Sequence, residues 1–483
     1  MILNYRKYIF SQSIALLAAI GSNAENIEKP NIVYVFADQF RQQSLGFLKQ
    51  DPVKTPNINA FAKGAVFLQN AASNLPLCSP FRAMLMTGKW PSKNTIKTNC
   101  NVKSPFELRD SEVCLSDVLA ANGYECGYIG KWHLTRPLKN YPKFNKRPGW
   151  DAFTPPRSRH GFNFWYSYGC NDEHLTPHYW TSKADENAAN SPKEYSVEHE
   201  TKIAVKYISN KNGKYRKRKK PFLLFVSYNP PHPPYGLVPQ KYKKLYNDKS
   251  IDQLLNRYNI PKNKTELKKF AGLWGWPEKN CKTIKNSWLH KRAIWYFAAI
   301  SAVDQGFGKI LNAIKKAGIE KNTIIIFSAD HGENLGSQGR MQKGTINTES
   351  FSIPFLIQYK GKIKPGTNTL LFNAPDIMPT LLGLAGLNKN IPTQVQGTDY
   401  SKLFLGGKMK QPLTQPYIDW GICRGVRSKN YTFHNCYGNK EPVLFDNRKD
   451  PYQMNNIAAE NPNLVKKFRQ AIQCWNEKML RDK

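Results

Sequence analysis

Two pairs of polar residues carry side chains that can bind a metal ion. Asp38 stands beside Gln39, and Asp330 stands beside His331. Each pair closely follows an apolar, β-rich segment of the chain. Carboxylate and amide oxygens and an imidazole are ligands that a hard or borderline divalent cation accepts. The pairs predict a metal site that bridges two strand ends, with Ca²⁺ or Mg²⁺ favoured by the carboxylates and Mn²⁺ or Zn²⁺ left open by His331.

Cys78 stands at the start of a short predicted helix that lies between these pairs in the sequence. Pro80 is favoured in a first helical turn, and Gly88 is favoured just past the end of a helix. The amino terminus of a helix presents backbone N–H groups and the positive end of a dipole, which suits a bound sulfate or phosphate. As an ordinary thiol, Cys78 would be a structural residue or half of a disulfide.

Further polar residues follow two other apolar segments. Lys131 and His133 come after residues 124–129, and His232 comes after residues 222–227. In open α/β sheets the active crevice lies beyond the carboxyl ends of the strands. Each residue alone could cap a helix or occupy a turn, but their common placement predicts a single site.

The elements that must position these residues alternate between strand-like and helical patterns. Such alternation predicts an α/β fold with a large, mostly parallel sheet sandwiched by helices. Helical patterns cover residues 288–317 and 375–385. The predicted strands are residues 31–36, 124–129, 222–227, 323–328 and 353–359.

The pattern changes after about residue 405, where Gly406 and Gly407 mark a predicted boundary. A hairpin-like stretch over residues 425–445 follows, and then a helix that begins near Asn461 and Pro462. We therefore predict a smaller carboxy-terminal α+β subdomain made of a small antiparallel sheet and a helix. The predicted divisions are a signal peptide over 1–24, a catalytic α/β domain over 25–405 and this subdomain over 406–483.

The amino terminus has the pattern of a secretory signal peptide. Arg6 and Lys7 precede an apolar run over residues 14–20, and Ser22 and Ala24 offer a cleavage point. The run is shorter than the roughly 20 apolar residues that a transmembrane helix needs, and no later stretch reaches that length. We expect an exported protein, periplasmic or secreted, without a transmembrane segment. A buried first strand or a retained anchor is the alternative.

The chain has nine cysteines, and eight remain when Cys78 is set aside. An even number suits an oxidising compartment. Cys423 and Cys436 flank part of the hairpin-like stretch and are predicted to form one disulfide. Ordinary buried thiols are the alternative.

The formal net charge of +36 and the basic run over residues 214–220 point to anionic partners. No nucleic-acid-binding module is recognisable, so nucleic acid is excluded and a sulfated polysaccharide is favoured. A solvated loop in a lysine-rich chain is the alternative for the basic run. Residues 157–180, rich in aromatic rings and histidine, are predicted to line the substrate side, although a packed insertion would have the same composition.

The sequence Cys78-Ser79-Pro80-Phe81-Arg82 resembles the signature of the formylglycine-dependent sulfatases, in which Cys-x-Pro-x-Arg directs oxidation of the cysteine to formylglycine (3-oxoalanine). Other segments resemble the rest of that family in the same order. The resemblance spans about residues 31–456 and implies the fold of the alkaline phosphatase-like superfamily. The matching segments are residues 31–39, 130–134, 230–234, 328–333, 339–343 and 444–456.

The resemblance also implies what each candidate residue does. A divalent cation, usually Ca²⁺, would be bound by Asp38, Gln39, Asp330, His331 and the modified Cys78. Arg82 would hold the hydrated formylglycine. The sulfate would be surrounded by Lys131, His133, His232 and Lys343, and His232 or a neighbour would protonate the departing alcohol. A separate formylglycine-generating maturation enzyme is the implied partner.

The chemistry agrees with these residue types. One hydroxyl of a hydrated aldehyde attacks sulfur, and the second then expels sulfate and restores the aldehyde. Many family members have Asp-Asp in place of Asp38-Gln39 and Asn in place of His331, and the variants found here resemble a subset that includes phosphonate monoester hydrolases. Three hypotheses follow: a sulfatase of sulfated saccharides or polysaccharides, a phosphonate monoester or phosphodiester hydrolase, and a non-catalytic binder of sulfated glycans.

Overall fold

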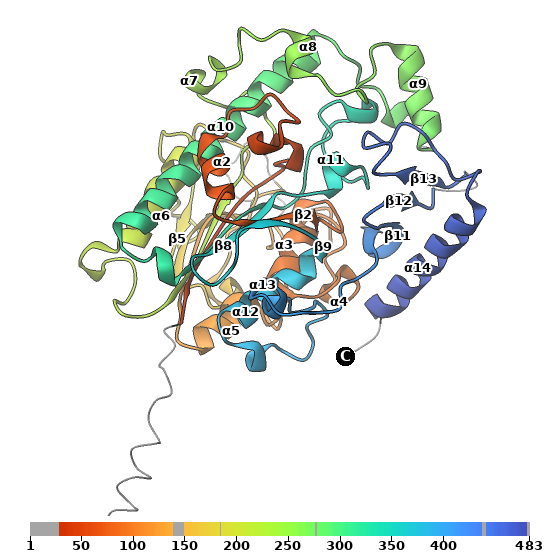
Figure 1. Cartoon of the computed structure of the whole chain (residues 1–483). Helices are drawn as coiled ribbons and strands as arrows, with labels where there is room; N and C mark the ends of the chain where they lie inside the picture. Colours follow the sequence, from red (N-terminus) through yellow and green to blue (C-terminus); the bar gives the residue numbers. More distant parts are fainter. Residues whose placement is uncertain (1–28, 139–148, 184, 276–277, 437–440, 481–483) are drawn as a thin grey trace, which may run out of the picture.

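The computed structural model describes residues 29–138, 149–183, 185–275, 278–436 and 441–480. Within these ranges the chain forms a large sheet and a small sheet, with helices around both (Figure 1). The predicted signal peptide over 1–24 lies outside the described residues. No helix among the described residues is long and apolar enough to cross a membrane.

The large sheet has nine strands among the described residues, in the order β5-β4-β3-β6-β1-β7-β8-β2-β9. The run from β4 to β7 is parallel, whereas β5 and β8 pair antiparallel with their neighbours. This confirms the predicted mostly parallel sheet. The strands are β1 (Asn31–Ala37), β2 (Val66–Ala72), β3 (Glu125–Lys131), β4 (Phe164–Tyr168), β5 (Trp180–Thr181), β6 (Phe222–Tyr228), β7 (Thr323–Ala329), β8 (Phe355–Tyr359) and β9 (Gly366–Asn373).

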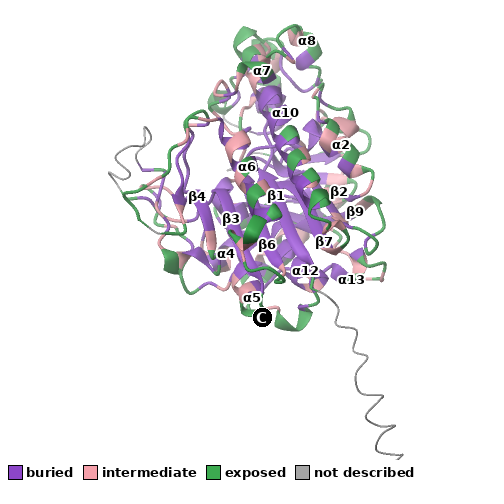
Figure 2. Cartoon of the chain, turned by 90° about the vertical axis from the view of Figure 1, so that its left-hand side faces the viewer, coloured by how far each residue is buried: buried purple, intermediate pink, exposed green. Residues whose placement is uncertain are grey.

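The central strands β1, β6 and β7 are mostly apolar because both of their faces are covered. Every residue of β1, β3, β6 and β7 is buried, and Figure 2 shows these strands inside a shell of more exposed helices. β1 lies between β6 and β7, so that Ile32 is opposite Leu223 on one side and Ile324 on the other. Since parallel strands end at one edge, the residues after β1, β6 and β7 must lie near one another.

Helices cover both faces of the large sheet (Figure 1). Their bounds are α2 (Pro56–Ala62), α3 (Cys78–Thr87), α4 (Pro91–Asn94), α5 (Leu115–Ala121), α6 (Ser196–Ser209), α7 (Gln240–Lys243), α8 (Ile251–Leu254), α9 (Lys264–Leu273), α10 (Ser287–Lys316), α11 (Thr348–Phe351), α12 (Ile377–Leu384), α13 (Ser401–Phe404) and α14 (Pro462–Leu480). α2 and α6 pack on α10, and α5 and α12 pack on α3. The long predicted helix is α10, and its first turn is capped by Asn286, whose side chain accepts the Leu289 N–H at 2.9 Å.

The small sheet is antiparallel and carries the carboxy-terminal helix. It consists of β10 (Gln415–Asp419), β11 (Ile422–Arg427), β12 (Tyr431–His434) and β13 (Val443–Asp446). The Phe468 ring of α14 stacks on Phe433 at 5.7 Å, and Trp475 meets Trp90 of the larger part at 5.6 Å. The predicted small sheet plus helix is confirmed, whereas the boundary at residue 405 stays a prediction.

The predicted disulfide between Cys423 and Cys436 is wrong, because neither sulfur is part of a disulfide. The Cys423 thiol donates to the Gly425 carbonyl at 3.1 Å, and the Cys436 thiol donates to the Trp274 carbonyl at 3.3 Å. All nine cysteines lie in the described residues and none forms a disulfide, and Cys474 alone among them is exposed. The alternative of buried thiols therefore describes this pair.

The basic run over residues 214–220 lies between α6 and β6, at the amino end of β6. Arg216 is packed within the fold, since its guanidinium lies 4.2 Å from the Phe222 ring centroid and donates to the Ile208 carbonyl. Most of its neighbours in the run are exposed. A strand of this length spans roughly 20 Å. The run therefore lies about that far from the residues at the carboxyl edge, at the opposite edge of the sheet.

Candidate active site

The predicted site residues converge on Cys78 at the carboxyl edge of the large sheet. Asp38 follows β1, His331 follows β7, and Cys78 begins α3. The Cys78 sulfur lies 3.3 Å from His331 Nε2 and 3.6 Å from Asp38 Oδ1. Cys78 is only 1% exposed. The sequence placed these residues at separate strand ends, and the parallel topology joins them.

Asp38, Cys78, Asp330 and His331 form a compact group of metal-ligand atoms. Their ligand atoms all lie within 4.8 Å of one another. His331 Nδ1 is hydrogen-bonded to the Gly332 carbonyl at 3.0 Å, which turns Nε2 towards the group. Burial and then the negative charge of Asp38 raise the pKa of Asp330 to about 7. Buried carboxylates this close repel one another, so a divalent cation fits the donor set.

Gln39 also reaches the site, but its carboxamide is already hydrogen-bonded. Its Oε1 accepts the Lys343 ammonium at 2.7 Å, and its Nε2 donates to the Tyr235 hydroxyl at 3.2 Å and to Glu333. Its backbone N–H donates to Asp330 Oδ1 at 3.0 Å. Gln39 has a positive φ of 69°, a conformation that is uncommon outside glycine. The backbone hydrogen bond from Gln39 to Asp330 thus connects the end of β1 with the end of β7.

Arg82 lies one helical turn after Cys78 and holds both carboxylates. Its guanidinium donates to Asp330 Oδ2 at 3.0 Å and to Asp38 Oδ2 at 3.2 Å. It also donates to the Lys131 carbonyl at 2.6 Å and to Ser227 Oγ at 2.8 Å. Burial lowers the pKa of Arg82, but Asp330 and its other neighbours raise it more, so the group stays charged. Arg82 therefore fixes the carboxylates, and its implied contact with a formylglycine hydrate stays a prediction.

Two lysine ammonium groups flank Cys78. Lys131 Nζ lies 2.7 Å from Asp38 Oδ2 and 4.0 Å from the Cys78 sulfur. Lys343 Nζ lies 3.5 Å from the same sulfur. Lys131 also donates to Asn229 Oδ1 at 3.1 Å. The cationic groups give an anion beside residue 78 a favourable potential.

His232 lies at the more open side of the site, with 14% of its side chain exposed. Its Nδ1 is 3.3 Å from Asp172 Oδ1 and 2.7 Å from the Pro233 carbonyl, while its own carbonyl accepts His174 Nε2 at 2.9 Å. Burial and then the charges of Lys343 and Lys131 lower the pKa of His232 to about 4. An anionic ligand would raise this pKa and so favour the protonated imidazole.

His133 is buried next to the same cluster. Its Nε2 is 3.1 Å from the Cys100 carbonyl, which can only accept a hydrogen bond, so Nε2 carries the proton. Its Nδ1 is buried without a partner among the described residues. Burial, and then the charge of Lys131, lower its pKa well below the usual range. His133 is therefore neutral, with one acceptor nitrogen still available.

Several residues that support the site were not predicted from the sequence. Asn229 directly follows β6, so its position gave a signal like that of the other strand-end residues. Asp172 and His174 belong to the aromatic stretch over 157–180, and they contact His232. Most rings of that stretch, including Trp165, are instead buried in the core. The packed-insertion alternative therefore describes most of the stretch.

Comparison with known proteins places the chain in a family. The family model described as Sulfatase matches residues 30–387. The chain belongs to the sulfatase family. A second model, described as the C-terminal part of N-sulphoglucosamine sulphohydrolase, matches residues 336–478. The resemblance carried by the segment around Cys78 is confirmed, and this sulfatase is a sulfuric ester hydrolase.

Individual relatives cover nearly the whole sulfatase chain. It is 39% identical to the Endo-4-O-sulfatase of Bacteroides thetaiotaomicron over 94% of both sequences. It is 32% identical to the Ulvan-active sulfatase of Formosa agariphila, over 89% of this chain and 78% of that protein. A solved structure from work on glycosaminoglycan metabolism by B. thetaiotaomicron superposes with a TM-score of 0.84 and 38% identity, over 94% of this chain and 97% of that one.

Proposed function

We propose that this sulfatase removes sulfate from a saccharide or polysaccharide, with a formylglycine made from Cys78 and one divalent cation. The observation that carries the proposal is the surroundings of the Cys78 sulfur. It lies close to the ammonium groups of Lys131 and Lys343, and it belongs to the same compact group of metal-ligand atoms as two carboxylates and an imidazole. The names of the two sulfatase relatives, one 4-O-specific and one ulvan-active, support a glycan substrate.

The metal site in this proposal is built from Asp38, Asp330, His331 and the modified Cys78, with Gln39 beside them. Its carboxylates favour Ca²⁺, and Mg²⁺ or Mn²⁺ remain chemically compatible. When bound, the cation would act as a Lewis acid, and the hydrated aldehyde would supply the attacking hydroxyl. Arg82 keeps the two carboxylates in place for this arrangement.

The remaining residues bind and neutralise the sulfate group. The ammonium groups of Lys131 and Lys343 lie 4.0 Å and 3.5 Å from the Cys78 sulfur and would offset the charge that develops on the sulfate oxygens. His133, whose Nδ1 has no partner among the described residues, would offer that nitrogen as a hydrogen-bond acceptor beside the sulfate. The pattern of residues 1–24 and the glycan-acting relatives also support export to the periplasm or the medium, where polymeric substrates are met.

The test is release of free sulfate by protein coexpressed with a formylglycine-generating enzyme. Defined oligosaccharides sulfated at single ring positions, the 4-O position included, are compared with an aryl phosphodiester and an aryl phosphonate monoester. We expect sulfate release to exceed turnover of the phosphorus esters by orders of magnitude. Protein made without the maturation enzyme is the control, and faster turnover of the phosphorus esters would replace the sulfatase proposal with the second hypothesis.

Replacing His232 by asparagine should affect substrates according to their leaving group. If His232 protonates the departing oxygen, kcat on a saccharide sulfate should fall about 10²- to 10⁴-fold. An aryl sulfate, whose phenolate leaves without protonation, should lose less than about tenfold. Steady-state kinetics on both substrates measure the difference.

The matched control is His199→Asn, since His199 lies on α6 and is hydrogen-bonded to Tyr166 at 2.8 Å. It should leave both rates close to those of the unaltered enzyme. Equal losses on the two substrates in His232→Asn would assign His232 to sulfate binding instead of proton donation.

A further inference from the structure

A cavity of about 380 Å³ lies directly beside the proposed sulfate site. One wall is α10, and the others are the loops that follow β6 and β7. The lining residue Pro233 directly follows His232, and the lining residue Gln342 directly precedes Lys343. A ligand in this cavity would therefore adjoin two of the residues assigned to the sulfate.

Tyr235 forms a wall that the cavity shares with the site. Its ring lines the cavity, while its hydroxyl accepts Gln39 Nε2 at 3.2 Å and donates to Glu333 at 2.7 Å. The buried hydroxyl end thus touches the residue next to Asp38. The cavity and the site therefore share Tyr235 as a common wall.

The α10 wall presents two aromatic rings and a cation. Trp288, Arg292 and Trp295 all line the cavity, and their spacing puts them on one helix face. Trp288 is 44% exposed, and the guanidinium carbon of Arg292 lies 3.4 Å from its ring centroid. Lys243 of α7 donates to the carbonyl of the lining residue Gly236 at 2.9 Å, and its ammonium lies 5.8 Å from the Trp295 ring centroid.

Arg292 forms no ion pair with any of the residues that the structure describes. Its flat guanidinium, supported from behind by an indole ring, is suited to a carboxylate or a sulfate, which it can bind with two parallel hydrogen bonds. The exposed Trp288 indole suits the C–H surface of a sugar ring, and the half-buried Trp295 ring extends the same wall. The volume is at the small end for ligand pockets, which limits the occupant to a short part of a glycan.

We propose that this cavity is a subsite for an acidic sugar unit that neighbours the unit carrying the scissile sulfate. Arg292 binds its anionic substituent, and Trp288 and Trp295 contact its ring. The anion is either the carboxylate of a uronic acid or a second sulfate group. This subsite rests on the proposed sulfatase action at Cys78 and defines part of its substrate as an anionic oligosaccharide.

The test compares Arg292→Ala with the unaltered enzyme on a sulfated monosaccharide and on sulfated disaccharides. The disaccharides carry a uronate neighbour, the same neighbour reduced to a neutral hexose, or a neutral neighbour with a second sulfate. We expect KM on the matching acidic disaccharide to rise about ten- to a hundredfold. kcat/KM on the monosaccharide and on the carboxyl-reduced compound should stay within about twofold. The disaccharide that shows the effect identifies carboxylate or sulfate as the anion.

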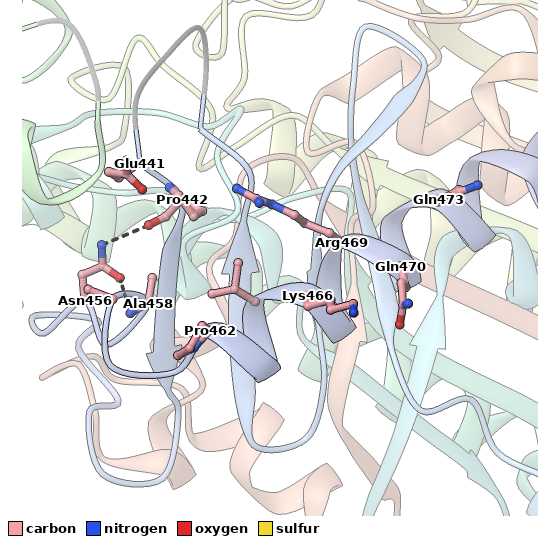
Figure 3. A pocket seen from close by; sticks show the side chains of 11 residues that line it. Glu441, Pro442, Asn456, Ala458, Pro462, Lys466, Arg469, Gln470 and Gln473 are labelled. Carbon is pink, nitrogen blue, oxygen red and sulfur yellow. Dashed lines mark hydrogen bonds between the residues drawn. The ribbon is translucent and has the colours of Figure 1, made fainter.

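Arg469→Ala is the matched control. Arg469 is an exposed arginine that lines a different cavity, of about 710 Å³, between α14 and the small sheet (Figure 3). It should change no KM, whereas Trp288→Ala should raise KM on both acidic disaccharides. Equal kinetics of Arg292→Ala and the unaltered enzyme on all substrates would overturn the subsite. Absence of sulfate release by the unaltered, matured enzyme would instead overturn the proposed function.

Discussion

Replacing Cys78 by alanine is expected to lower kcat for sulfate release by about 10⁵-fold or more. The substitution removes the cysteine sulfur, so residue 78 can no longer be oxidised to an aldehyde. Lys131, Lys343 and the carboxylates would remain in place, but no group would attack the sulfur of the ester. Because only one buried atom is lost, the cost to the free energy of unfolding should be about 1–2 kcal/mol.

Free sulfate measured over hours by ion chromatography checks this expectation, and a thermal melt shows that the variant is folded. Cys78→Ser is the informative companion, since a single hydroxyl lacks the second oxygen that expels sulfate. Cys78→Ser should therefore also fail to release sulfate over repeated turnovers. Sulfate release by Cys78→Ala at more than about a hundredth of the normal rate would remove Cys78 from the chemistry.

Replacing Asp330 by alanine is expected to abolish turnover and to remove the bound cation. Asp330 is a proposed ligand, and it also accepts hydrogen bonds from Arg82 and from the backbone of Gln39. Its loss leaves a buried guanidinium less well paired, which should cost about 3–5 kcal/mol of stability. Asp330→Asn keeps the shape and should lose activity by more than about 10³-fold with a smaller loss of stability. Metal content by mass spectrometry, kcat and melting temperature separate the two effects.

Asp304→Asn is the control for removing a buried carboxylate elsewhere. Asp304 lies on α10 and accepts the Ile58 N–H at 2.8 Å, at the start of α2. This variant should keep its metal and its kcat. Chelation of the unaltered enzyme followed by addition of Ca²⁺, Mg²⁺ or Mn²⁺ should restore activity and identify the ion. Full metal content together with normal turnover in Asp330→Asn would show that the metal site is wrongly assigned.

Three of the strands that were predicted from the sequence are mostly apolar runs at the centre of the sheet. β1, β6 and β7 can each be recognised from their own apolar residues, without knowledge of the strands that pair with them. β2 and β9 were not predicted, because each mixes exposed polar residues into its run. β5 has only two residues and exists as a strand through its pairing with β4.

The candidate site was predictable to the extent that its residues follow strands. Asp38, Lys131, His232 and Asp330 could be placed at one sheet edge before any coordinates were known. Asp172 could not, because it reaches His232 from a loop whose path no local pattern encodes. The position of the basic run relative to Cys78 could not be predicted either. Only the direction of β6 shows that the run lies at the opposite edge of the sheet from Cys78.

The position of β1 in the sheet has a consequence for how the chain folds. β1 comes first in the chain among the described strands, yet it lies at the centre of the large sheet, and its neighbours β6 and β7 follow much later in the sequence. Until β6 is available neither edge of β1 has its partner, and until β7 is available one edge stays unpaired. Such long-range pairing folds slowly, so an unpaired β1 is a segment through which incompletely folded chains can associate.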